Sequence, residues 1–179
     1  MGREVRKVPE NWNHPKDEKG SFVPLYSGAG VAFAKAESDW NEGYAMWQKG
    51  LCESYRDDDK WEPIEEKYKN MRFTEYHGGR PSPDDYMPDW PDEVATHFMM
   101  YEDTSEGTPI SPAFATPEEL AKWLTETGAS AFGDMTGTYE GWLRTARGGY
   151  SPSMIMYSSG IHSGIDFFAQ ENEKPQSVS

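Results

Sequence analysis

The sequence is poor in several features on which functional assignments often depend. Cys52 is the only cysteine among 179 residues, so neither an intramolecular disulfide nor a multi-cysteine metal site is possible. The first residues lack the apolar core of a signal segment, and no run approaches the roughly 18 apolar residues that a membrane span needs. We therefore expect a cytoplasmic protein that does not bind membranes.

Basic side chains are also scarce. The chain has 17 Lys and Arg against 31 Asp and Glu, which gives a net charge of -14. Nucleic acids and anionic membranes attract Lys and Arg, so this balance argues against direct electrostatic binding to either. A partner that this surface attracts through charge is expected to be basic.

Common catalytic signatures are missing from the sequence. It has no Gly-rich phosphate loop, no G-x-S-x-G elbow and no H-E-x-x-H zinc helix. No two histidines are spaced as a metal-binding pair on a helix, and Cys52 has no neighbouring His that would activate it as a nucleophile. The four histidines are His14, His77, His97 and His162. The sequence therefore predicts no catalytic residue, no metal ligand and no cofactor.

Aromatic residues are abundant, although hydrophobic residues in total are not. Phe, Trp and Tyr make up 14% of the chain, within 36% hydrophobic residues. Disordered acidic chains are poor in aromatics, and one domain usually takes roughly 100–200 residues. The composition predicts a single folded domain over 1–169, followed by a polar tail over 170–179 that is expected to fray.

Capping signals and hydrophobic periodicity predict both helices and strands. Thr116 with Glu119 forms a capping pattern, and Asp39 with Glu42 resembles one. The predicted helices are one from Thr116 to Gly128, one from Thr138 to Gly148-Gly149, one over 39–49 that ends before Gly50, and a short one over 63–70. The predicted strands cover 4–8, 97–101, 154–157 and 161–168, the last two joined as a hairpin through Ser158-Ser159-Gly160. This order predicts an α+β fold with helices packed on a small antiparallel sheet and a C-terminal β-hairpin.

One predicted helix carries an aromatic stripe. Trp40, Tyr44 and Trp47 recur at i, i+4 and i+7. Such a stripe is usually part of a core, so core packing is the favoured interpretation. A partner contact is the alternative, because Trp and Tyr dominate binding hot spots.

The negative charge is concentrated in an acidic, Pro-rich middle segment. Residues 53–106 hold 16 acids and 6 bases, a net charge of -10, whereas residues 1–52 are neutral overall. A solvated face is one interpretation; a binding surface is the other, with aromatic anchors between the carboxylates. The candidate partner-binding residues are Asp57, Asp58, Asp59, Trp61, Glu62, Glu65, Glu66, Asp84, Asp85, Tyr86, Asp89, Trp90, Asp92 and Glu93.

Several distinctive motifs lie outside the acidic middle of the chain. They are the opening over 3–15 (REVRKVPENWNHP), the run over 105–112 (SEGTPISP), the run over 114–120 (FATPEEL) with Trp123-Leu124, and the shorter runs GASAFG over 128–133, TYE over 138–140 with Trp142-Leu143, and PSM over 152–154. Together these motifs resemble a family of small uncharacterised proteins encoded by tailed bacteriophages and prophages. The resemblance covers about half of the chain and excludes residues 50–95. It implies expression in the cytoplasm of an infected bacterial host, and it supplies no mechanism or catalytic residue.

These observations favour one class of function and leave two others open. The favoured hypothesis is an acidic phage protein that inhibits a host defence complex which handles nucleic acid, such as a CRISPR effector or a restriction system, by occupying its basic surface. A basic host protein or a nucleic-acid-binding complex is the expected partner. The alternatives are a virion or assembly component and, third, a small phage hydrolase whose site has no linear motif.

Overall fold

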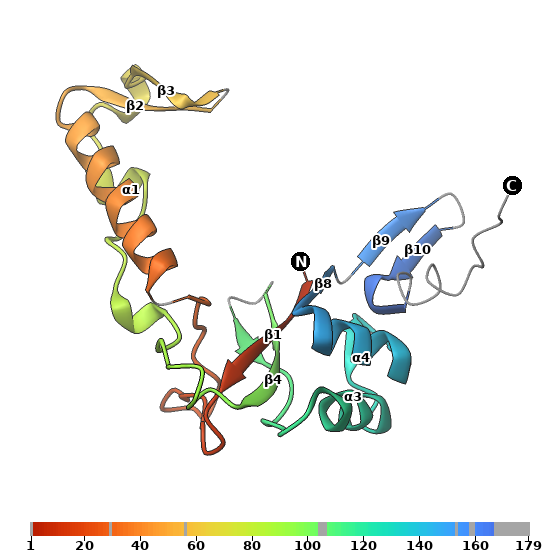
Figure 1. Cartoon of the computed structure of the whole chain (residues 1–179). Helices are drawn as coiled ribbons and strands as arrows, with labels where there is room; N and C mark the ends of the chain where they lie inside the picture. The colour runs from red at the N-terminus through yellow and green to blue at the C-terminus, as the bar shows by residue number, and fades with distance from the viewer. Residues whose placement is uncertain are drawn as a thin grey trace, which may run out of the picture. The chain divides into compact units, whose positions relative to one another are not determined.

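The chain folds into two compact units, shown in Figure 1. In the computed structural model, residues 2–28, 30–55, 57–103, 107–152, 154–157 and 160–166 are described, without the side chains of residues 57–59, 157 and 161. Unit 1 is formed by residues 1–25 and 90–179, and unit 2 by residues 26–89. The fold class is α+β, as predicted. The predicted tail over 170–179 lies outside the described residues.

Unit 1 is built on a four-stranded antiparallel sheet in the order β5-β4-β1-β8. Its strands are β1 (Gly2–Val8), β4 (His97–Glu102), β5 (Thr108–Pro109) and β8 (Tyr150–Pro152). The other elements of the unit are α3 (Pro117–Glu126), α4 (Tyr139–Gly148), the short pair β6 (Ser130–Phe132) and β7 (Met135–Thr136), and the hairpin β9 (Met154–Tyr157) and β10 (Gly160–Ser163). Helices on an antiparallel sheet and a C-terminal hairpin are both confirmed, although the second hairpin strand ends at Ser163 rather than at 168.

The core of unit 1 lies between the sheet and the two helices. Helices α3 and α4 pack against each other and contact β4 and β1. The fully buried side chains include Met100 of β4, Leu120 and Leu124 of α3, and Trp142 of α4. Apolar positions on one face of each helix are therefore covered by one face of the sheet, as their spacing predicted.

Both helices of unit 1 begin where their capping residues predicted. The Thr116 hydroxyl accepts a hydrogen bond from the Glu119 amide at 3.2 Å, and the Glu119 carboxylate accepts one from the Thr116 amide at 3.3 Å. The Thr138 hydroxyl accepts from the Gly141 amide, and Gly149 ends α4 in the left-handed region at φ 84°. These caps pair amide groups that the first helical turn leaves without partners.

Unit 2 consists of one long helix, a hairpin and a return segment. Its elements are α1 (Val31–Trp47), β2 (Leu51–Ser54), β3 (Asp57–Pro63), the 3₁₀ turn η1 (Glu66–Tyr68), α2 (Phe73–Tyr76) and the 3₁₀ turn η2 (Pro83–Asp85). The β2–β3 hairpin lies at the C-terminal end of α1, and the chain then returns along the helix towards its start (Figure 1). Tyr26 and Tyr86 form a backbone bridge where this return ends.

Two element boundaries in unit 2 differ from the predicted ones. Helix α1 begins eight residues before Asp39, which is not a cap but pairs with Lys35 one turn earlier at 2.5 Å. The alanine-rich start of α1 has high helix propensity, so the helix extends without a capping side chain. The predicted helix over 63–70 is wrong, because Pro63 ends β3 opposite Leu51 and only the turn η1 is helical. Gly50, at φ 80°, follows the end of α1, as predicted.

Candidate functional site

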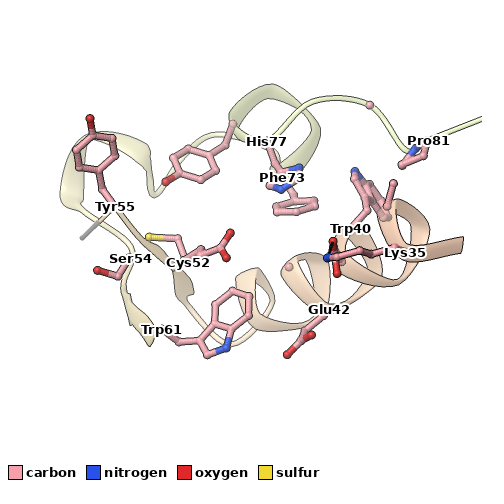
Figure 2. A pocket seen from close by; sticks show the side chains of 16 residues that line it. Lys35, Trp40, Glu42, Cys52, Ser54, Tyr55, Trp61, Phe73, His77 and Pro81 are labelled. Atoms are coloured by element: carbon pink, nitrogen blue, oxygen red, sulfur yellow. Dashed lines mark hydrogen bonds and ion pairs between the residues drawn. The ribbon is translucent and has the colours of Figure 1, made fainter. Parts of the chain in front are cut away.

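An open groove of about 1230 Å³ lies on unit 2 between α1, the β2–β3 hairpin and α2. Figure 2 shows Trp61 on the hairpin side, Trp40 on the helix side and Phe73 between them. The side chains that line the groove include Lys35, Asp39, Trp40, Glu42, Cys52, Glu53, Ser54, Tyr55, Trp61, Phe73, Tyr76 and His77. Helix, hairpin and return segment of the same unit thus contribute to one surface.

The groove is backed by a cluster of aromatic rings centred on Phe73. Phe73 is only 5% exposed, and its ring lies 5.2 Å from Trp40, 5.8 Å from Trp47 and 4.9 Å from His77, between centroids. The remaining rings of the cluster are those of Tyr44, Tyr68 and Tyr76. The aromatic stripe of α1 therefore packs onto Phe73 on one side.

The same rings remain open to solvent on their other side. Tyr44 is 42% exposed and Tyr76 is 37% exposed, while Tyr55 at the hairpin is fully exposed. Gly43 is the buried residue of α1, and every other residue of the helix is at least partly exposed. The rings of the stripe thus form the small core of unit 2, as the favoured interpretation predicted, and part of their surface stays exposed.

Charged side chains at the groove are mainly acidic. Asp39, Glu42 and Glu53 are opposed by Lys35 alone, which is tied to Asp39. The Asp39 hydrogen bond and charge, with a smaller contribution from Glu53, raise the pKa of Lys35. Within the described part of the chain, neither Glu42 nor Glu53 forms an ion pair. The groove therefore presents two carboxylates to an incoming ligand.

Polar groups lie beside the aromatic rings deeper in the groove. Burial, followed by a hydrogen bond with the Cys52 thiol, raises the pKa of Tyr76, so its hydroxyl stays neutral at physiological pH. His77 stacks on Phe73 at an interplanar angle of 23°. The neutral Tyr76 hydroxyl can form hydrogen bonds with a ligand. Within the described residues, no three His, Cys, Asp or Glu side chains are grouped closely enough to hold a metal ion.

Among the predicted partner-binding residues whose side chains the structure describes, only Trp61 lines this groove. Glu62, on the same strand, accepts a hydrogen bond from the Ser54 hydroxyl at 2.8 Å. Glu65 pairs with Lys67 at 3.0 Å and Glu66 with Lys69 at 2.5 Å. The side chains of Asp57, Asp58 and Asp59 lie outside the described residues, although their backbone forms the start of β3.

The other predicted residues of unit 2 lie on the return segment. Asp84 and Asp85 belong to η2, where the Asp85 carboxylate accepts a hydrogen bond from the Ser82 amide. Tyr86 packs its ring against Tyr26 at 5.3 Å and against Phe33 at 5.5 Å. Asp89 is exposed and approaches Gly30 at the start of α1.

The last three predicted residues belong to unit 1. Trp90 packs against Trp12 at 4.7 Å, and Asp92 and Glu93 are exposed in the loop before β4. The acidic segment over 53–106 is therefore split, with a net charge of -5 in its unit 2 part, 53–89, and -5 in its unit 1 part, 90–106. The predicted partner-binding residues therefore belong to both units.

Sequence interpretation missed Glu42, Glu53 and Tyr55 as groove residues. Glu42 lies on α1 near Trp40, and Glu53 and Tyr55 lie on the hairpin, so their proximity depends on how the hairpin folds onto the helix. The aromatic stripe that includes Trp40 and the predicted anchor Trp61 were the signals that pointed to this surface. No local pattern distinguishes Glu42 and Glu53 from the other acidic residues of the chain.

The motif over 9–15 has a structural role in unit 1. His14 is 2% exposed, and its ring contacts the Tyr101 hydroxyl at 3.2 Å and the Val23 carbonyl at 2.7 Å. The Trp12 indole donates to the same hydroxyl at 3.2 Å, and the Arg6 guanidinium lies 4.4 Å from the centre of the Tyr101 ring. This network holds the loop after β1 against β4.

Burial also shifts the proton equilibria of this network. Burial lowers the pKa of His14, and the nearby charge of Arg6 acts in the same direction. Burial raises the pKa of Tyr101 to about 12. Both groups are therefore neutral in the folded protein near pH 7, as a structural role requires.

Comparison with known proteins finds no matching protein-family model, no matching curated protein and no matching solved structure. Among the described helices, none combines the length and the apolar character that crossing a bilayer would require.

Proposed function

We propose that this chain is an interaction protein whose unit 2 binds a basic surface of a complex that handles nucleic acid. The resemblance of its terminal motifs to phage and prophage proteins supports a role as a phage-encoded inhibitor of a host defence complex, such as a CRISPR effector or a restriction system, in the cytoplasm of the infected bacterium. The partner's basic groove would normally receive phosphates, and the acidic surface of unit 2 would occupy it.

The observation that carries this proposal is the exposed aromatic and acidic groove of unit 2. The unit keeps few side chains fully buried, yet it arranges rings from α1, the hairpin and the return segment around an open surface. Exposed aromatic side chains gathered in this way are typical of binding sites, because they bury large areas at little entropic cost. A unit that only had to support its own fold would gain more by covering them.

The charge of unit 2 supports a basic partner. Residues 26–89 contain 14 acids and 8 bases, a net charge of -6. Charge of one sign steers an oppositely charged partner and accelerates encounter, and salt screens this effect over about 10 Å at 0.1 M. The interaction should therefore weaken as salt is raised.

Affinity capture from infected host lysate tests the proposal. The full chain is used as bait at about 50 mM and at about 500 mM salt, where the screening length differs about threefold. A double charge reversal in the groove, Glu42→Lys with Glu53→Lys, is compared with the reversal of two exposed acids of unit 1, Asp92→Lys with Glu93→Lys. Both variants change the net charge equally.

The expected result is capture of a basic nucleic-acid-binding complex at low salt by the parent chain and by the unit 1 variant, but not by the groove variant. Equal capture by all three proteins would refute a role for unit 2. A partner retained equally well at both salts would refute electrostatic recognition and indicate an apolar interface.

A further inference from the structure

We propose that the groove of unit 2 is an arginine-recognition site. It would take an arginine side chain from a basic segment of the partner, with the guanidinium stacked on the aromatic wall and hydrogen-bonded to Glu42 and Glu53. This assignment rests on the proposed function, since it names the chemical group by which the partner is recognised.

The aromatic wall supplies the first part of the argument. Trp40, Trp61 and Tyr76 line the groove from α1, β3 and α2 respectively, with Phe73 between them. A cation over an aromatic face is attracted by the ring's quadrupole, and Trp is the strongest of the natural rings. A planar guanidinium also stacks on rings and is more weakly hydrated than an ammonium, so this wall favours arginine over lysine.

The carboxylates supply the second part. Lys35 already neutralises Asp39 at one end of the groove, whereas Glu42 and Glu53 form no ion pair with a described residue. The guanidinium offers a fork of N–H donors that matches a carboxylate geometrically, whereas an ammonium acts as a point charge. An acidic rim beside rings therefore complements an arginine, and it repels phosphate or carboxylate ligands.

The size of the groove supports a peptide segment as the occupant. Its volume of about 1230 Å³ is larger than a single side chain fills, and it is partly open to solvent. Small-molecule sites typically have about 300–1,000 Å³ and are enclosed. An arginine together with its neighbours in an extended segment fits this open shape better than a small molecule does.

The chain contains a natural reporter for the test. Cys52 is the only cysteine, is partly buried and lines the groove (Figure 2). Its alkylation rate with iodoacetamide, followed by intact-protein mass spectrometry, should fall when a ligand fills the groove. The probes are a pentaarginine peptide, a pentalysine peptide of the same charge and a neutral pentacitrulline peptide.

We expect the arginine peptide to slow Cys52 alkylation at least about fivefold and to bind about tenfold more tightly than the lysine peptide in calorimetry. The citrulline peptide should not protect Cys52. The double variant Glu42→Gln with Glu53→Gln keeps the side-chain shape and should weaken arginine binding about tenfold. The matched control Glu66→Gln with Asp84→Asn removes the same charge from unit 2 outside the groove and should bind as the parent does.

Equal affinities for the arginine and lysine peptides would overturn the assignment, as would equal losses in the groove variant and the control variant. The test also separates this inference from the proposed function. Arginine binding with Cys52 protection, but no basic complex in the lysate capture, would leave the site standing and refute the proposed function. Salt-dependent capture of a basic complex without protection of Cys52 would leave the proposed function standing and refute the arginine site.

Discussion

Replacement of Phe73 by alanine should strongly destabilise unit 2 and leave the stability of unit 1 unchanged. Phe73 is 5% exposed at the centre of the ring cluster and contacts rings from α1 as well as His77. Gly43 lies directly against it, since a Cβ at Gly43 would stand 3.0 Å from the Phe73 ring. Phe73 is therefore the buried centre of the contact between α1 and the return segment.

The magnitude follows from burial and from ring contacts. A buried Phe→Ala substitution costs about 3–5 kcal/mol, because transfer and cavity terms add. A unit of this size is stable by only about 3–10 kcal/mol on the usual per-residue scale. A loss of about 4 kcal/mol thus removes a large part of the stability and should raise hydrogen-exchange rates across unit 2 about a thousandfold. Phe73→Leu, which keeps an apolar side chain, should cost about half as much.

Hydrogen exchange read by mass spectrometry is the appropriate assay, because it reports each peptide separately. In Phe73→Ala, peptides from α1 and β2 should lose protection while those from β1 and β4 keep it. The matched variant is Leu124→Ala, which removes a side chain of 0% exposure from the core of unit 1. It should show the opposite pattern.

Loss of protection over the whole chain in both variants would refute the reasoning. It would mean that the two units unfold as one cooperative body, so that the stability of unit 2 does not depend on its own small core. A Phe73→Ala protein with unchanged protection in α1 would equally show that the ring cluster does not hold the helix.

Three further perturbations test other parts of the structure. Burial lowers the pKa of His14, so the unfolded state binds a proton at this side chain more readily than the folded state does. The stability of the parent protein should therefore fall as the pH drops through about 6.5. The difference between the urea midpoints at pH 7.5 and pH 5.5 should be smaller in His14→Gln than in the parent. Thr116→Ala removes the cap of α3 and should cost about 1 kcal/mol in urea denaturation, whereas Thr74→Ala at an exposed site should not. Gly107 has φ 83°, and a Cβ there would lie 1.9 Å from the Leu25 carbonyl oxygen. Gly107→Ala should therefore lower the free energy of unfolding by about 3 kcal/mol. Since roughly 2–4 °C of melting temperature is lost per kcal/mol, a change of under 1 °C would contradict this prediction.

The helices and strands of unit 1 were largely predictable because their signals are local. Thr116 and Thr138 cap the helices that follow them, and Gly149 ends the second one in the left-handed region, as their positions indicated. In unit 2 the boundary of α1 was missed, because alanines extend a helix without any capping signal. The predicted helix over 63–70 failed because pairing between β2 and β3 overrides the preference of Pro63 for a first helical turn.

The candidate site was predictable only in part. Trp61 was identified from the acidic, aromatic segment, and the stripe of Trp40 was noted as a possible contact. Glu42 and Glu53 were not distinguished, because each belongs to a different element and neither has a motif around it. Their shared position at the groove arises from the hairpin folding beside α1, which is a non-local event.

The sequence alone determined the α+β class, the capped helices and the negative net charge, because these follow from residue type, spacing and summed charge. Only the tertiary structure decided how that charge is displayed. It divided the acidic middle segment equally between two units, at -5 each, and paired two of its carboxylates with lysines. It also placed beside aromatic rings two carboxylates, those of Glu42 and Glu53, that form no ion pair with a described residue. Net charge is a sum along the chain, whereas recognition depends on which side chains packing brings within reach of one ligand.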